Sequence, residues 1–164
     1  MSSTKENLWA AFAGESQANR KYLAYAKKAE AEGYSQVAKL FRAAASAETV
    51  HAHAHLRVLG QVKSTVENLK DAIAGETHEF KEMYPEMIAT AQSEGETSAE
   101  RSFKFANKVE KVHAELYQKA MENLENLKEV DYYVCEVCGY TCESEAPERC
   151  PVCGVKKDKF FKAD

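Results

Sequence analysis

Apolar residues recur every three or four positions through most of the first 130 residues, the pattern of amphipathic helices. Capping-box pairs mark three helix starts, at Ser3 with Glu6, Ser64 with Glu67 and Thr97 with Glu100, and glycines at 33, 60 and 95 mark helix ends. The pattern predicts four helices, over 4–32, 35–59, 65–94 and 97–127. Pro85 should kink the third, because proline removes a backbone donor and clashes with the preceding turn. We therefore expect an all-α four-helix bundle over residues 1–130.

Polar residues interrupt the apolar stripe of every predicted helix near its middle. The first stripe runs through Leu8, Ala11, Ala18, Tyr22, Tyr25 and Ala29, and the fourth through Phe103, Ala106, Tyr117, Ala120, Leu124 and Leu127. The interruptions are Glu15 in the first helix, Glu48 and His51 in the second, Glu76 and nearby Glu79 in the third, and Glu110 and His113 in the fourth. An uncompensated carboxylate in a bundle core costs several kcal/mol. Cations or protons must therefore compensate these groups.

An internal repeat connects the interruptions. Ala13-Gly14-Glu15-Ser16 matches Ala74-Gly75-Glu76-Thr77 at an offset of 61 residues, and Glu48-Thr49-Val50-His51 matches Glu110-Lys111-Val112-His113 at 62. Two Glu-x-x-His pairs and two single glutamates are the six ligands of a di-iron or di-manganese site in a helix bundle. A solvated helix face explains one such pair, but not two in repeat register. Glu79, which corresponds to Ala18, breaks the symmetry, and His53, His55 and His78 lie outside it.

Charge and cysteine usage narrow the class of protein. The net charge of −4 gives no basic field for nucleic acid or an anionic membrane, and no apolar run is long enough to span a bilayer. The first residues include no apolar stretch resembling a secretion signal, so we expect a cytoplasmic protein. All five cysteines fall between residues 135 and 153. In a reducing compartment such a cluster indicates metal rather than disulfides.

The cysteines form two Cys-x-x-Cys turns, Cys135 with Cys138 and Cys150 with Cys153, separated by eleven residues. Two such turns can hold one tetrahedral metal and stabilise a small domain, here 131–164, with aromatic residues at 132, 133, 140, 160 and 161. The spacing alone accommodates either zinc or a single iron, and zinc is the commoner occupant. Cys142 lies outside both turns and is expected to be a spare thiol.

The order of these motifs resembles rubrerythrin over essentially the whole chain. The resemblance implies a ferritin-like di-iron bundle followed by a rubredoxin-like β/loop domain with one iron bound by four cysteines. It also implies a non-haem di-iron peroxidase that reduces hydrogen peroxide to water in oxidative stress defence, and it changes the expected tail metal from zinc to iron.

The resemblance further implies roles for individual residues. One iron would be bound by Glu15, Glu48, Glu110 and either Glu79 or His51, and the other by Glu48, Glu76, Glu110 and His113. The first iron moves between Glu79 and His51 with redox state: four carboxylates neutralise two ferrous ions, whereas a ferric pair, even with an oxo bridge, accommodates a fifth. Tyr22 and Tyr84 match family tyrosines that lie near the cluster.

The electron supply predicts an assembly. Glu110 lies 17 residues before Leu127, roughly 25 Å of helix at about 1.5 Å per residue, so the tail of the same subunit should lie too far from the bundle site. Family members solve this with head-to-tail homodimers, some with exchanged helices, and take electrons from rubredoxin or an NAD(P)H-dependent reductase. Two other functions stay open: a ferritin-like iron store, which needs neither Glu79 nor the tail, and a zinc-stabilised interaction module.

Overall fold

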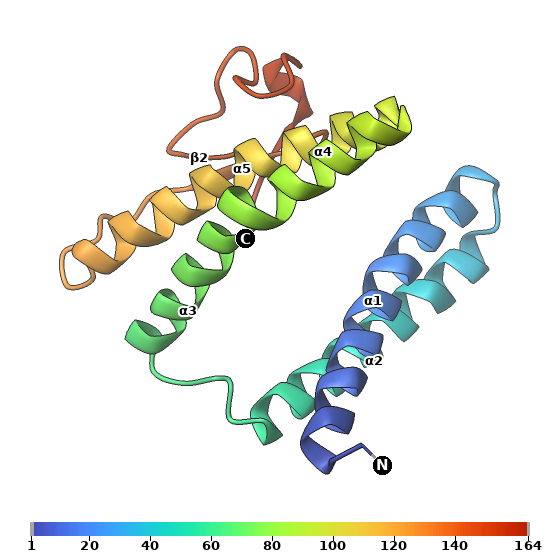
Figure 1. Cartoon of the computed structure of the whole chain (residues 1–164). Helices are drawn as coiled ribbons and strands as arrows, with labels where there is room; N and C mark the ends of the chain where they lie inside the picture. Colours follow the sequence, from blue (N-terminus) through green and yellow to red (C-terminus); the bar gives the residue numbers. More distant parts are fainter. Residues whose placement is uncertain (1, 164) are drawn as a thin grey trace. The chain divides into compact units, whose positions relative to one another are not determined.

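The computed structural model describes residues 2–163. The chain forms two compact units, Met1–Lys63 and Ser64–Asp164, and each is described by itself (Figure 1). None of the described helices is both long and apolar enough to cross a membrane.

The first unit is a hairpin of two helices, α1 (Thr4–Ala31) and α2 (Ser35–Val58). The predicted capping box at Ser3 is present, because Ser3 Oγ accepts from the Glu6 N–H while a Glu6 carboxylate oxygen accepts from the Ser3 N–H. The two helices meet along small residues. Ala38, Ala45 and Ala52 of α2, spaced seven apart, are 0%, 1% and 6% exposed. A line of methyl groups at heptad spacing lets the two backbones approach closely.

The second unit begins with a helix interrupted by one wide turn. The helix α3 (Thr65–His78), capped by Ser64 and Glu67 as predicted, leads into the π-helix η1 (Glu79–Met83) and then α4 (Tyr84–Glu94). The N–H of Tyr84 donates to Glu79 O, five residues back. In Figure 1 the helix changes direction between α3 and α4. The interruption predicted at Pro85 thus takes the form of a π-helical turn that ends just before the proline.

This wide turn explains why the repeat offset changes. Glu76 follows its counterpart Glu15 by 61 residues, whereas Gly95 follows its counterpart Gly33 by 62. One extra residue therefore lies between Glu76 and Gly95, and a π-helical turn is how a helix accommodates one extra residue. Beyond the turn the repeat holds at an offset of 62. Tyr22 packs on Phe41 with ring centroids 6.1 Å apart, and Tyr84 packs on Phe103 at 6.3 Å.

Two details of the predicted helices are wrong. The last bundle helix, α5 (Thr97–Glu122), begins after Glu96, and no side chain caps it, because the Glu100 carboxylate accepts instead from Lys104 and Gln92. The helix also ends at Glu122 rather than at residue 127, since residues 123–126 form turns.

Apart from Ala29, the two predicted apolar stripes do not contain the most buried positions. Several of their members keep more than a third of their surface exposed, namely Tyr25, Tyr117, Leu124 and Leu127. The best-buried helical side chains are mainly alanines and Val109. A helix pair buries only the narrow seam along which its helices touch, so larger side chains beside the seam stay open to solvent.

The tail forms a three-stranded antiparallel sheet in the order β2-β1-β3. Its strands are β1 (Tyr132–Cys135), β2 (Thr141–Glu143) and β3 (Phe160–Lys162), with the short 3-10 helix η2 (Lys157–Lys159) before β3. Tyr140 and Phe160 pack edge to face, with ring centroids 6.4 Å apart.

Candidate metal centres

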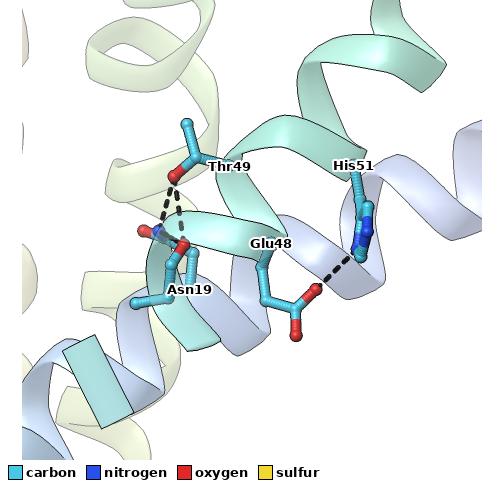
Figure 2. A network of polar contacts seen from close by, with 5 residues as sticks. Asn19, Glu48, Thr49 and His51 are labelled. Atoms are coloured by element: carbon cyan, nitrogen blue, oxygen red, sulfur yellow. Dashed lines mark hydrogen bonds and ion pairs between the residues drawn. The ribbon is translucent and has the colours of Figure 1, made fainter. Parts of the chain in front are cut away.

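Glu15, Glu48 and His51 form the first ligand set. One ligand atom from each lies within 4.8 Å of the others. Nδ1 of His51 lies 2.9 Å from a Glu48 carboxylate oxygen, as Figure 2 shows. Glu and His three residues apart project from one helix face, which is why the Glu-x-x-His pattern brings these groups together. The His51 side chain is 55% exposed, against 18% for Glu48.

A neighbouring hydrogen-bond network fixes the register of α1 against α2 at this level. Asn19 Nδ2 donates to Ala45 O at 2.7 Å and to Thr49 Oγ1 at 2.9 Å, and Thr49 Oγ1 also donates to Ala45 O (Figure 2). Asn19 lies one turn after Glu15, and Thr49 is adjacent to Glu48. The network therefore holds the two helices at the height of the ligands. No motif in the sequence marks Asn19, because its position in the second repeat holds no asparagine.

Glu76, Glu110 and His113 form the second ligand set, also within 4.8 Å of one another. Nδ1 of His113 lies 2.8 Å from a Glu110 carboxylate oxygen and 3.7 Å from a Glu76 carboxylate oxygen. Burial raises the pKa of Glu76, and the neighbouring Glu110 carboxylate raises it further. Crowded carboxylates with a histidine are a donor set that a divalent cation stabilises, because the cation offsets their repulsion.

Glu79 lies beside the second ligand set, although it is not one of the three residues grouped there. It is the first residue of the π-helical turn. Burial raises the pKa of Glu79, the Glu76 carboxylate adds to the effect, and His78 and His113 oppose it. Glu79 therefore shares the electrostatic environment of the second set.

The two predicted tyrosines pack against aromatic rings, Tyr22 against Phe41 and Tyr84 against Phe103. Among residues 2–163, neither tyrosine hydrogen-bonds to a glutamate. Burial raises the pKa of Tyr84, followed by the charges of Glu110, Glu79 and Glu76, which places its hydroxyl in the field of those carboxylates. Among the histidines outside the internal repeat, His78 forms an ion pair with Glu82 at 3.2 Å on an exposed surface.

Cys135, Cys138, Cys150 and Cys153 form the cysteine cluster, with their four sulfur atoms within 4.8 Å of one another. The Cys135–Cys153 and Cys138–Cys150 sulfur pairs are 3.7 and 3.5 Å apart. A tetrahedral metal with bonds of about 2.3 Å requires sulfur separations of about 3.8 Å, so the cluster fits one ion. Each Cys-x-x-Cys turn closes on a glycine with positive φ, Gly139 and Gly154.

Backbone donors favour a thiolate at one of the four cysteines. Burial opposes ionisation of Cys150, but hydrogen bonds from the N–H groups of Cys153 and Val152 outweigh it and lower the pKa of Cys150. At Cys138 and Cys153 burial prevails and raises the pKa of the thiol. Cys142 lies outside the cluster, as predicted. Its Sγ donates instead to Tyr133 O and Glu145 O, at 3.7 and 3.5 Å.

The cysteine domain lies against the helix that carries the second ligand set. Thr141 Oγ1 of β2 is 3.0 Å from Nε2 of His113, and Lys119 of α5 pairs with Glu143. The expectation that the tail of the same chain lies too far from the bundle ligands is therefore wrong for this set. That expectation required the tail to extend beyond the end of the helix. Instead, the chain turns after Glu122 and folds back along α5.

These features define a class: a helical protein with two Glu/Glu/His ligand sets and a C-terminal domain with a tetra-cysteine site. The family model described as rubrerythrin matches residues 6–121, and the model of the rubrerythrin rubredoxin-like domain matches residues 133–161. The chain belongs to the rubrerythrin family. Its fold class is accordingly a ferritin-like helical part followed by a rubredoxin-like domain, as predicted.

Individual relatives match along nearly the whole chain. Rubrerythrin-2 of Clostridium acetobutylicum is 40% identical over 96% of this chain and 95% of its own. Nigerythrin of Nitratidesulfovibrio vulgaris is 37% identical over 96% and 85%. A solved structure described as the fully reduced, all-ferrous state of nigerythrin has a TM-score of 0.60 at 36% identity, covering 99% of this chain and 88% of that one.

Membership of the family establishes the metals. Rubrerythrins are non-haem di-iron oxidoreductases with a di-iron site and one iron bound by four cysteines. The residues of this chain fit both groups, since two carboxylate-and-imidazole sets suit a pair of iron ions and four converging sulfurs suit a single one. The predicted iron in the tail is confirmed over zinc.

Proposed function

We propose that this chain is a peroxidase that reduces hydrogen peroxide to water and serves in oxidative stress defence. The observation that carries the proposal is the cysteine cluster lying in the same compact unit as the second ligand set, joined to it through Thr141 and His113. An iron store has no need of a one-electron centre beside its ligands. A peroxidase must have its iron pair reduced again after every turnover.

Both ligand sets together would bind the iron pair, with Glu48 and Glu110 as bridging ligands. The two sets supply four carboxylates and two imidazoles, the ligand complement of a di-iron carboxylate site. When bound, the iron pair supplies two electrons, which with two protons convert one hydrogen peroxide into two waters.

We assign to Glu79 and His51 the role of alternative ligands, which exchange at the first iron when the redox state changes. His51 is more than half exposed, and among residues 2–163 the one hydrogen bond of its ring is the contact of Nδ1 with Glu48. Glu79 has a raised pKa, so its carboxyl group retains a proton more readily than an exposed glutamate. A cation beside it would displace that proton. Glu79 can thus alternate between a neutral side chain and a fifth carboxylate ligand.

We also propose a homodimer, head to tail and with helices exchanged between subunits, that receives electrons from rubredoxin or an NAD(P)H-dependent reductase. Each unit carries only half of the bundle ligands. Large apolar side chains of the first helix pair are open in the single chain, including Leu40 at 67% and Val50 at 63% exposed. Apolar area of this kind calls for a covering surface. A monomer in solution with full peroxide turnover would contradict the dimer.

Anaerobic reduction followed by peroxide titration tests the activity. The protein should contain about three irons per chain, and one equivalent of peroxide should oxidise the ferrous pair, observed by its ferric absorption. Failure of one peroxide to oxidise the pair would refute the proposal. Iron loading far above three per chain would indicate storage, and zinc in the cysteine cluster would leave no electron relay.

A further inference from the structure

Strand β2 presents alternate side chains to α5. Residues 141 and 143 share one face of the strand because strand side chains alternate. Thr141 meets His113 of α5, and Glu143 meets Lys119 of the same helix. Cys142, between them, donates to backbone oxygens on the tail side. The alternation therefore aims Thr141 at the helix that carries the second ligand set.

The residues just before β2 also lie close to α5. A Cβ added at Gly139 would lie 3.8 Å from Val109, which is 2% exposed on α5. Gly139 therefore lies beside the helix one turn before His113. Thr141 Oγ1 lies 3.1 Å from Gly139 O and donates to it. The hydroxyl proton is thereby committed, and the oxygen is left as an acceptor facing His113.

The two repeat-related histidines, His51 and His113, differ in how many of their ring nitrogens have a hydrogen-bond partner. His113 contacts Glu110 through Nδ1 and Thr141 through Nε2, and its side chain is 27% exposed. His51 contacts Glu48 through Nδ1, but among the described residues no hydrogen bond or ion pair reaches its Nε2. One histidine is held at both ring nitrogens and the other at one. No symmetric bundle pattern produces this difference, because it comes from the tail.

We propose that Thr141 is a positioning residue that fixes His113 as a permanent metal ligand. The inference rests on the ligand role assigned to His113 in the proposed function. With a metal on Nδ1, the remaining ring proton is on Nε2 and donates to Thr141 Oγ1, which donates in turn to Gly139 O, next in sequence to Cys138. Such an acceptor orients a ligating imidazole and raises its basicity. The domain that supplies electrons thus also holds one ligand of the site that receives them.

Replacement of the hydroxyl tests this role. Thr141→Val keeps the shape of the side chain and should weaken anaerobic ferrous binding at the bundle site roughly 10–100-fold in competition with a chelator. It should also raise the reduction potential of the iron pair, because a less basic imidazole stabilises ferric iron less. Thr141→Ser restores the hydroxyl and should restore both values. Thr90→Val, which removes a hydroxyl that donates only to Glu86 O on α4, should change neither.

In every variant, the visible absorption of the iron in the cysteine cluster reports whether the tail is folded. If Thr141→Val lacks this absorption, Thr141→Ala is used to repeat the test. Ferrous affinity and potential unchanged in Thr141→Val, or no rescue by Thr141→Ser, would overturn the inference. The variant His113→Ala distinguishes failure of the role assigned to Thr141 from failure of the proposed function. If His113→Ala retains both bundle irons, the ligand assignment itself is wrong. If it loses them while Thr141→Val does not, only the role of Thr141 fails.

Discussion

Removal of the Asn19 side chain should loosen the first helix pair by a calculable amount. Asn19→Ala deletes two hydrogen bonds, to Ala45 O and to Thr49 Oγ1, in a part-buried position. At about 0.5–1.5 kcal/mol each, their loss predicts a decrease of about 1–3 kcal/mol in the free energy of unfolding. The decrease should fall in the upper half of this range if the loosened helices also expose the alanine seam. Iron occupancy should decrease with it, because Glu48 is adjacent to Thr49.

The only tryptophan in the sequence makes the measurement specific to this unit. Trp9 lies on α1, packs edge-on against Phe12 with ring centroids 6.0 Å apart, and is 40% exposed. Its fluorescence should therefore follow the unfolding of the helix pair in urea, in the metal-free chain. A second probe, far-ultraviolet circular dichroism, follows all helices and shows whether the two units unfold separately.

A double-mutant cycle separates the two hydrogen bonds. Thr49→Val removes the bond from Asn19 and also the bond that Thr49 donates to Ala45 O, and should cost about 1–3 kcal/mol. The double variant should lose less than the sum of the two single losses, because both single changes remove the Asn19–Thr49 bond. Gln17→Ala, an exposed substitution on the same helix, is the control and should stay within about 0.5 kcal/mol of the parent. An Asn19→Ala chain as stable as the control, or full additivity with Thr49→Val, would refute the role assigned to this network.

Three further predictions follow from the sites. Glu79→Ala should keep the metals but slow peroxide turnover, and unchanged steady-state turnover would rule out the exchange with His51. The metal-free chain should lose stability as the pH rises from the ordinary glutamate pKa of 4.5 through the raised pKa of Glu76, because the folded state binds the extra proton; urea titrations of Glu76→Gln should show a smaller decrease over that window. Cys138→Ser should abolish the visible absorption of the tail iron, whereas Cys142→Ser should leave it intact; equal loss in both would place Cys142 among the ligands.

The helices and ligands could be read from the sequence because both depend on local spacing. The period of apolar residues, the Ser3 and Ser64 capping boxes and the glycine ends fixed most helix bounds to within a residue. The two Glu-x-x-His pairs project from one face by helix geometry alone. Both ligand sets accordingly lie where the repeat predicted, although their joint binding of an iron pair stays a prediction.

The features that the sequence did not predict depend on contacts between distant parts of the chain. Asn19 meets residues 26 and 30 positions away, and Thr141 meets a residue 28 positions away. Neither contact leaves a periodic signal. The expected cap at Thr97 failed because Glu100 pairs with Lys104 instead. The distance argument about the tail failed because it measured helix length without allowing the chain to reverse.

The π-helical turn has a consequence for how the two halves of the molecule diverged. The repeats differ in length by one residue between the first glutamate and the glycine that ends the helix, and one residue is one codon. A duplicated gene segment that gained a single codon would thus yield a half with a wide turn, while the other half kept a regular helix. The glutamate at the start of the turn, where the other half has Ala18, is a second difference, of one residue. Two small changes in one copy are then enough to make a symmetric pair of halves chemically unequal.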